Sequence, residues 1–203
     1  MLAFARLNLR WNPFGEAGLA TRAGLAIVGE DVLGGLASAL ARDRTAVQIL
    51  ASEGRGKTTY LLALAARAGA RYVRAQEETV IAPSPREALC CDEIELLPAR
   101  VRRRLYARCG SIALSTHADL TRELARAGLA VVTHRVSIGD RDELAAIIDR
   151  RISWARRGPG ALPRVPEASI AALQARHGDD VRAIEADLYH AFQGLREVGD
   201  VEV

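Results

Sequence analysis

A short glycine-rich segment between an apolar run and a helical run restricts this chain more than any other feature. Residues 45–51 suit a buried strand, residues 51–58 read Ala-Ser-Glu-Gly-Arg-Gly-Lys-Thr, and an alanine- and leucine-rich stretch continues to about residue 68. Glycines in such a turn can take positive φ angles and direct backbone N–H groups toward an anion. The segment therefore predicts a strand, a phosphate-binding loop and a helix in succession.

The loop departs from the usual form G-x-x-x-x-G-K-[ST] at its first position, which is Ala51. Lys57 is the only lysine of the chain, beside 27 arginines, and the two are not interchangeable at a phosphate cradle. A phosphate-binding loop is therefore favoured over a glycine turn that only connects a strand to a helix. We expect Lys57 to reach the β- and γ-phosphates of ATP, and Thr58 to bind Mg²⁺. The expected nucleotide-binding residues of this loop are Ser52, Glu53, Gly54, Arg55, Gly56, Lys57, Thr58 and Thr59.

A pair of carboxylates follows the apolar run 87–92, which is a strand candidate. At the end of a strand beside the loop, Asp92 would hold Mg²⁺ through water and Glu93 would polarise the attacking water. The alternative is an acidic strand end that faces solvent. Glu95 is interpreted as a surface charge.

The strand candidate 111–115 ends in polar residues, and two interpretations of Thr116 stay open. Its hydroxyl could contact the γ-phosphate or the lytic water. Alternatively, Thr116 and Asp119 have the spacing of a helix capping box. His117 lacks the cluster of partners that a metal ligand needs.

Two further features concern arginine. The expected helix 98–109 carries Arg100, Arg103, Arg104 and Arg108 mostly on one side, which could meet nucleic-acid phosphates or an acidic partner, although a solvated face is the simpler interpretation. Arg182 opens the last expected helix, where it could stabilise transition-state charge on a nucleotide or lie in solvent.

The order of elements predicts an α/β core followed by a helical domain. Strands and helices alternate through five units, with strand candidates at 45–51, 70–75, 87–92, 111–115 and 129–136 and helix candidates that include 30–42 and about 117–127. This alternation implies a parallel sheet with helices on both faces. From residue 140 onward the pattern is only helical, with candidates at 140–156, 166–177 and 180–195. We expect a core at 1–138, which begins with a loop at 1–28, and a helical domain at 139–203.

The amino-acid composition limits which binding partners and which cellular compartment we expect for this protein. The net charge of +3 and the pI of about 9.0 permit nucleic acid without requiring it, and only 4% of the residues are aromatic, so stacking platforms for single strands are scarce. Three cysteines argue against a disulfide framework, and Cys90 and Cys91 are expected in the core. Neither a secretory leader nor an apolar run of about 20 residues is evident, which predicts a cytoplasmic protein without a membrane partner.

Taken together, these motifs resemble those of the AAA+ P-loop ATPases, in particular the small bacterial type near the transposition-helper and secretion ATPases. The matching pieces, in order, are Val28-Gly29-Glu30, the loop at 51–58, Asp92-Glu93, Thr116-His117 and the run from Gly178 to Arg182. The resemblance implies the sheet order 5-1-4-3-2, a small C-terminal helical lid, Gly29 beside the adenine, and Thr116 and Arg182 as the two sensor residues.

The resemblance also implies a function and an assembly. It implies an ATPase, with ATP and Mg²⁺ as ligands, that acts as a switch or loader on a macromolecular partner. It further implies a homo-oligomer in which an arginine completes the neighbouring site, with Arg122 and Arg126 as candidates. The alternatives are a nucleotide-dependent DNA-binding regulator and, with less support, a small-molecule kinase.

Overall fold

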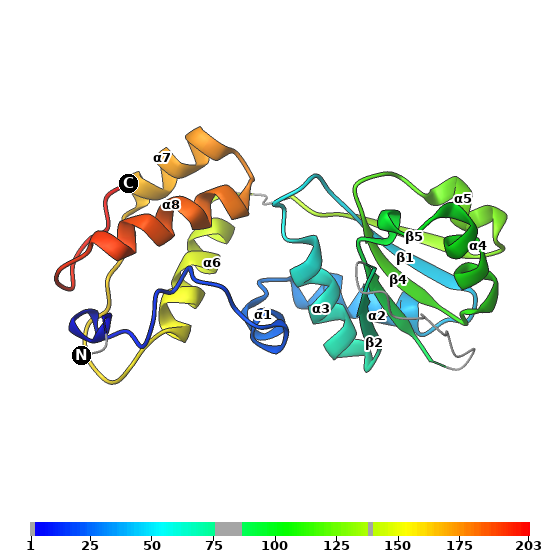
Figure 1. The fold of residues 1–203 in the computed structure, drawn as a ribbon, viewed down its shortest axis with the longest axis horizontal. Coiled ribbons are helices and arrows are strands. Elements are labelled where there is room, and N and C mark those ends of the chain that lie inside the picture. Colours follow the sequence, from blue (N-terminus) through cyan, green and yellow to red (C-terminus); the bar gives the residue numbers. More distant parts are fainter. Residues whose placement is uncertain (1–2, 76–86, 138–139) are drawn as a thin grey trace. The chain divides into compact units, whose positions relative to one another are not determined.

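A five-stranded parallel sheet forms the centre of the core (Figure 1). The computed structural model describes residues 3–75, 87–137 and 140–203. The strand order is β2-β3-β4-β1-β5, and all four pairings are parallel. The strands are β1 (Thr45–Leu50), β2 (Arg71–Arg74), β3 (Leu89–Asp92), β4 (Ile112–Thr116) and β5 (Ala130–Arg135). The α/β class and the order 5-1-4-3-2 are thereby confirmed.

The helices agree with the predicted pattern except at two places. They are α1 (Leu19–Leu25), α2 (Glu30–Leu40), α3 (Lys57–Ala68), α4 (Ala99–Arg108), α5 (Thr121–Arg126), α6 (Arg141–Trp154), α7 (Glu167–His177) and α8 (Val181–Gly194), with short 3-10 turns η1 (Ala5–Leu7) and η2 (Ile94–Leu96). α1 falls within the segment expected to be a loop, and α5 begins four residues later than the expected residue 117 because a turn precedes it. Within the described ranges, no helix has the length and apolar character that a bilayer crossing requires.

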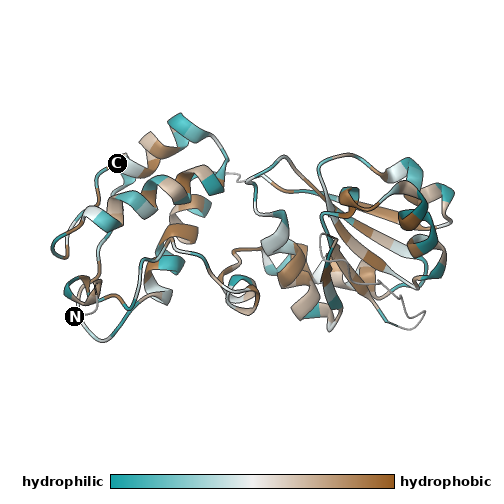
Figure 2. Cartoon of the chain, in the orientation of Figure 1, coloured by the Kyte–Doolittle hydropathy of each residue, from teal (hydrophilic) through white to brown (hydrophobic). Residues whose placement is uncertain are grey.

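Helices cover both faces of the sheet, which explains why its central strands are buried and mostly apolar. α2 and α3 pack on one face, where Val47 and Ile49 of β1 belong to their core cluster. α4 and α5 pack on the other face, where the cluster contains Ala46 of β1. All six residues of β1 are buried, as expected for a strand shielded on both sides. Figure 2 shows the hydrophobic residues gathered in the strands and the hydrophilic ones on α4 and α5.

The chain divides into two compact units, and the division corrects the predicted domains. The sheet unit comprises Arg22–Val136, and the helical unit comprises Met1–Thr21 together with Ser137–Val203. The change near residue 138 was expected, but residues 1–28 were assigned as a whole to the core. The N-terminal residues instead complete the core of the helical unit.

That core shows why the bundle needs the N-terminal segment. Leu7, Leu9 and Phe14 join one buried cluster with side chains of α6, α7 and α8. The ring of Phe14 lies 5.2 Å from that of Phe192, and Asn12 donates to the carbonyl of Tyr189 at 2.9 Å. Three short helices bury too little apolar surface by themselves, and the added segment enlarges their core.

The buried position of Leu9 leads to a stability prediction. Leu9→Ala removes a fully buried side chain and should lower the free energy of unfolding by about 2–5 kcal/mol. Leu19→Ala, at a side chain that is 49% exposed, is the matched control and should cost far less. Hydrogen exchange should show the loss of protection in α6, α7 and α8. Equal losses in the two variants would contradict the assigned packing.

Candidate nucleotide site

The glycine-rich loop has the backbone conformation that an anion cradle needs. Gly54 and Gly56 have φ angles of 74° and 82°, in the left-handed region that side chains disfavour. α3 begins at Lys57, directly after Gly56, so its first N–H groups and the positive end of its dipole lie at the loop. A Cβ placed on Gly56 would meet nothing within 4 Å, so backbone conformation rather than space accounts for this glycine. The residues therefore fit a phosphate group.

Lys57 is folded back onto the loop that carries it. Its Nζ donates to the carbonyl oxygens of Ala51 at 2.8 Å and Ser52 at 2.6 Å, and lies 3.1 Å from Nδ1 of His117. The residue is only 8% exposed. The ammonium thus sits where it can exchange backbone carbonyls for phosphate oxygens.

Asp92 is a fully buried carboxylate at the end of β3. Tyr72 of β2 donates to its Oδ2 at 2.8 Å, and Ser115 of β4 donates to its Oδ1. Burial, and secondarily the charge of Asp92, raise the pKa of Tyr72, which therefore remains a donor. Asp92 is thus oriented from both neighbouring strands, as a carboxylate that holds a water-coordinated cation would have to be.

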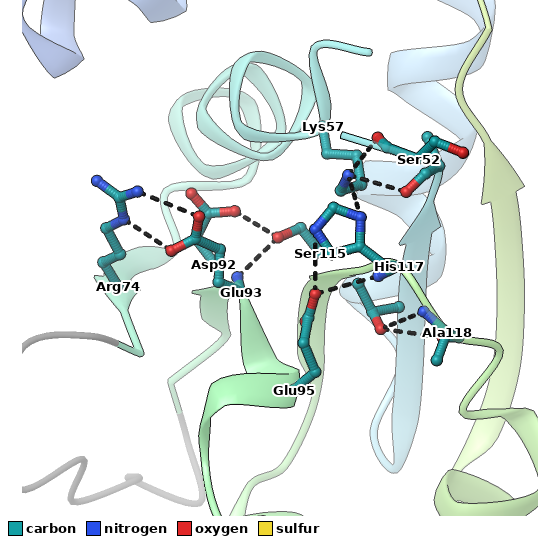
Figure 3. Close-up of polar contacts among 11 residues, drawn as sticks. Ser52, Lys57, Arg74, Asp92, Glu93, Glu95, Ser115, His117 and Ala118 are labelled. Atoms are coloured by element: carbon teal, nitrogen blue, oxygen red, sulfur yellow. Dashed lines mark hydrogen bonds and ion pairs between the residues drawn. The ribbon is translucent and has the colours of Figure 1, made fainter. Parts of the chain in front are cut away.

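Glu93 points away from the loop lysine and is held by β2. Arg74 donates to both of its carboxylate oxygens, at 3.0 and 3.1 Å (Figure 3). Its backbone is left-handed with φ of 55°, and its N–H donates to Ser115 at 2.8 Å. Because a bidentate arginine pair is among the stronger polar contacts, Glu93 must leave Arg74 before it can act as a base elsewhere.

The turn after β4 directs His117, rather than Thr116, toward the loop. The Thr116 hydroxyl donates to the carbonyl of Ala118 at 2.9 Å and accepts from its N–H at 3.1 Å. The residue before α5 is Leu120, which makes no side-chain cap, so the capping-box interpretation of Thr116 and Asp119 is wrong. Asp119 instead accepts from the N–H of Thr121 at 2.9 Å, and its hydrogen bonds with Thr121 lower its pKa to about 2.

Two residues that position this turn were not recognised from the sequence. Glu95 was interpreted as a surface charge, but its side chain is 25% exposed and contacts His117 through Oε1. Gln48 is fully buried in β1 and accepts from the N–H of Leu120 at 2.7 Å. A polar residue within an otherwise apolar strand was the signal that could have identified Gln48.

The remaining predicted residues belong to other elements or are buried thiols. Gly29 precedes α2 in the sheet unit, whereas Arg182 is exposed in the first turn of α8 in the helical unit. Cys90 and Cys91 are buried as predicted, and burial raises the pKa of each thiol to about 12. In the parts of the chain that the structure describes, no group of three His, Cys, Asp or Glu side chains could hold a metal ion alone. A cation at Asp92 and Thr58 would therefore need ligands from water and phosphate.

The Ser115 hydroxyl joins Asp92 to the backbone of Glu93, which leads to a stability prediction. Ser115→Ala removes the donor to a buried carboxylate and the acceptor of a backbone N–H, so it should lower the free energy of unfolding by about 1–3 kcal/mol. Ser111→Ala, just before the opposite end of β4, is the control and should cost less. Urea unfolding measures both, and an equal loss would contradict the role of Ser115.

The fold has clear counterparts among solved structures. NtrX from Brucella abortus in complex with ADP superposes with a TM-score of 0.61 at 18% identity, covering 89% of this chain and 56% of that one. RuvB from Thermotoga maritima, a Holliday junction branch migration motor, gives 0.55 at 17% identity, covering 81% and 61%.

AMPPCP-bound DnaA from Aquifex aeolicus gives a TM-score of 0.53 at 18% identity, covering 85% of this chain and 66% of that one. This chain thus spans less than two thirds of each of these proteins. The sequence matches no family model and no curated protein. NtrX, RuvB and DnaA are all AAA+ P-loop ATPases, and this chain has the AAA+ ATPase fold.

Proposed function

We propose that this protein is a Mg²⁺-dependent ATPase that acts as a switch or loader on a macromolecular partner. The observation that carries the proposal is the juxtaposition of Lys57, at the start of α3, with the polar ends of β3 and β4. The nucleotides bound to NtrX and DnaA, which share the fold, add support.

The proposed roles follow from the chemistry of the groups. The loop N–H groups would bind phosphate oxygens, and Lys57 would move from its carbonyl partners to the β- and γ-phosphates. Thr58 and Asp92 would hold Mg²⁺, which supplies charge neutralisation between the phosphates. Glu93 would polarise the attacking water once it is released from Arg74. Release of this kind offers a way for a partner to control hydrolysis.

Four further residues have proposed roles around the nucleotide. Gly29 would lie beside the adenine, and Arg182 would approach the phosphates from the helical unit. In a homo-oligomer, Arg122 or Arg126 of α5 would complete a neighbouring site. Both arginines are exposed, which such a role requires.

Glu93→Gln should bind ATP with Mg²⁺ like the unaltered protein and lose hydrolysis by about 100-fold or more, because an amide cannot accept the proton of water. Calorimetry measures binding and phosphate release measures turnover. Glu87→Gln changes a carboxylate that is 48% exposed and paired with Arg71, and it should retain activity. Absence of ATP binding at millimolar Mg²⁺ would reject the function. Full turnover in Glu93→Gln would reject only the proposed base, and phosphate transfer to an added acceptor would favour a kinase.

A second candidate function, nucleotide-dependent binding of DNA, is favoured by the outer face of α4. Arg100, Arg103, Arg104 and Arg108 are all exposed and recur at helical spacing. The nearby carboxylate Glu123 is already engaged by Arg102, with an N–O distance of 2.8 Å. From the start of α4 to the end of α5, residues 99–126 include seven arginines and two carboxylates. This excess of positive charge complements a phosphate backbone.

The second function predicts DNA binding that increases with ATP and weakens with salt. Arg103→Glu/Arg104→Glu should abolish this binding, because the substitutions replace two contacts to phosphates with repulsive carboxylates. Any binding that is left should depend less on salt, because fewer phosphates are neutralised. Fluorescence anisotropy with duplex DNA at several salt concentrations measures this. Arg42→Glu/Arg67→Glu, which alters two exposed arginines outside α4 and α5, has the same charge change and serves as the control. Equal losses in both double variants would indicate only nonspecific attraction, and unaltered binding would rule out this face.

A further inference from the structure

His117 bridges the loop lysine and a carboxylate of η2. Its Nδ1 lies 3.1 Å from Nζ of Lys57, and its Nε2 lies 3.4 Å from Oε1 of Glu95. Figure 3 shows the imidazole between these two groups, on the same side as the loop. A ligand that draws Lys57 away would therefore remove the contact of Nδ1 with the ammonium group.

The contact with Lys57 defines where the imidazole carries its proton. An ammonium group has donors only, so Nδ1 must accept from Nζ. The proton of a neutral ring then resides on Nε2, facing Oε1 of Glu95. With Lys57 in this position, a proton on Nδ1 would place two donors against each other, so this contact requires Nδ1 to be an acceptor.

Glu95 would stabilise a positive charge on the same ring. Its Oε1 accepts from the backbone N–H of His117 at 3.2 Å, while its Oε2 is buried without a hydrogen-bond partner among the described residues. Arg102 of α4 also acts on Glu95 electrostatically, but its hydrogen bonds go to Glu123 and the carbonyl of Leu97. Because no described residue hydrogen-bonds Oε2, the negative charge of Glu95 is only partly compensated. This charge would stabilise an imidazolium at His117.

We propose that His117 reads the γ-phosphate by taking up a proton when ATP, but not ADP, binds. The inference rests on the proposed function, in which Lys57 moves to the phosphates. Nδ1 then loses its donor and faces anionic oxygens, which repel its lone pair. A proton taken from solvent turns Nδ1 into a donor to the γ-phosphate, and no other bond is made or broken.

The surroundings of the ring supply one group for each of its nitrogens. Lys57 of α3 faces Nδ1 and Glu95 of η2 faces Nε2, while Asp92 of β3 is separated from the ring by Ser115 (Figure 3). Thr116 is the neighbouring candidate for contact with the phosphate, but its hydroxyl is bonded in its own turn. His117 is thus the side chain of this turn whose polar atoms face the loop.

The test measures proton uptake together with affinity. Calorimetric titrations of AMPPCP and of ADP, each with Mg²⁺ in buffers of different ionisation enthalpy, are run at about pH 8, where an ordinary imidazole is neutral. The unaltered protein should take up more protons with AMPPCP than His117→Asn does, and the nucleotide's own titration cancels between the two proteins. His117→Asn should also lose about tenfold of the preference for AMPPCP over ADP. His190→Asn, at an exposed histidine of α8, is the matched control and should retain both properties.

A second measurement needs no substitution. The chain has four histidines, so the ¹⁵N shifts of the His117 ring can be followed directly and should change from the neutral to the protonated pattern with AMPPCP alone. Nucleotide binding with equal proton uptake in the unaltered and His117→Asn proteins, or a ring that stays neutral, would overturn the inference and leave the proposed function intact. Failure of both nucleotides to bind would overturn both.

Discussion

The burial of Asp92 is the interaction on which the polar edge of this protein depends. A carboxylate without solvent contact at the end of a central strand is tolerated only when donors surround it. Tyr72 and Ser115 supply those donors from the strands on either side. Because Ser115 also accepts the N–H of Glu93, one buried charge connects β2, β3 and β4 at the edge that carries the loop and the turn after β4.

Four side chains proposed to act on a nucleotide or its Mg²⁺ ion are already hydrogen-bonded within the protein. Lys57 is bonded to loop carbonyls and His117, Glu93 to Arg74, and Asp92 to two hydroxyls. In the proposed function, ATP binding would move Lys57 from these contacts to the phosphates and would require Glu93 to leave Arg74, so the net gain in free energy is smaller than the new bonds alone would provide. A site that must rearrange suits a switch better than an enzyme of constant activity, because a partner can favour one arrangement.

The helical unit depends on residues that are far from its helices in the sequence. Its three helices have apolar faces, yet residues from the start of the chain complete its core. Asn8 donates to the carbonyl of Gly158 at 3.1 Å, and Leu9 pairs with Arg156. The first and last parts of the chain therefore fold as one body. A sequence boundary drawn only at a change of pattern assigned the first part to the wrong unit, since residue patterns do not say which partner an apolar segment finds.

Local patterns were sufficient for the five strands, for the helices other than α1, and for the loop. A strand covered on both faces must be apolar, a loop that turns N–H groups toward an anion needs Gly54 and Gly56, and a lone lysine marks Lys57. These requirements act within a few residues, so the sequence alone determined the order of the strands and the candidate site at Lys57 and Asp92. The partners of Gln48, Glu93, Glu95 and His117 were decided only by the tertiary structure. They join residues 19 to 85 positions apart, and only the strand order brings such residues within hydrogen-bonding distance.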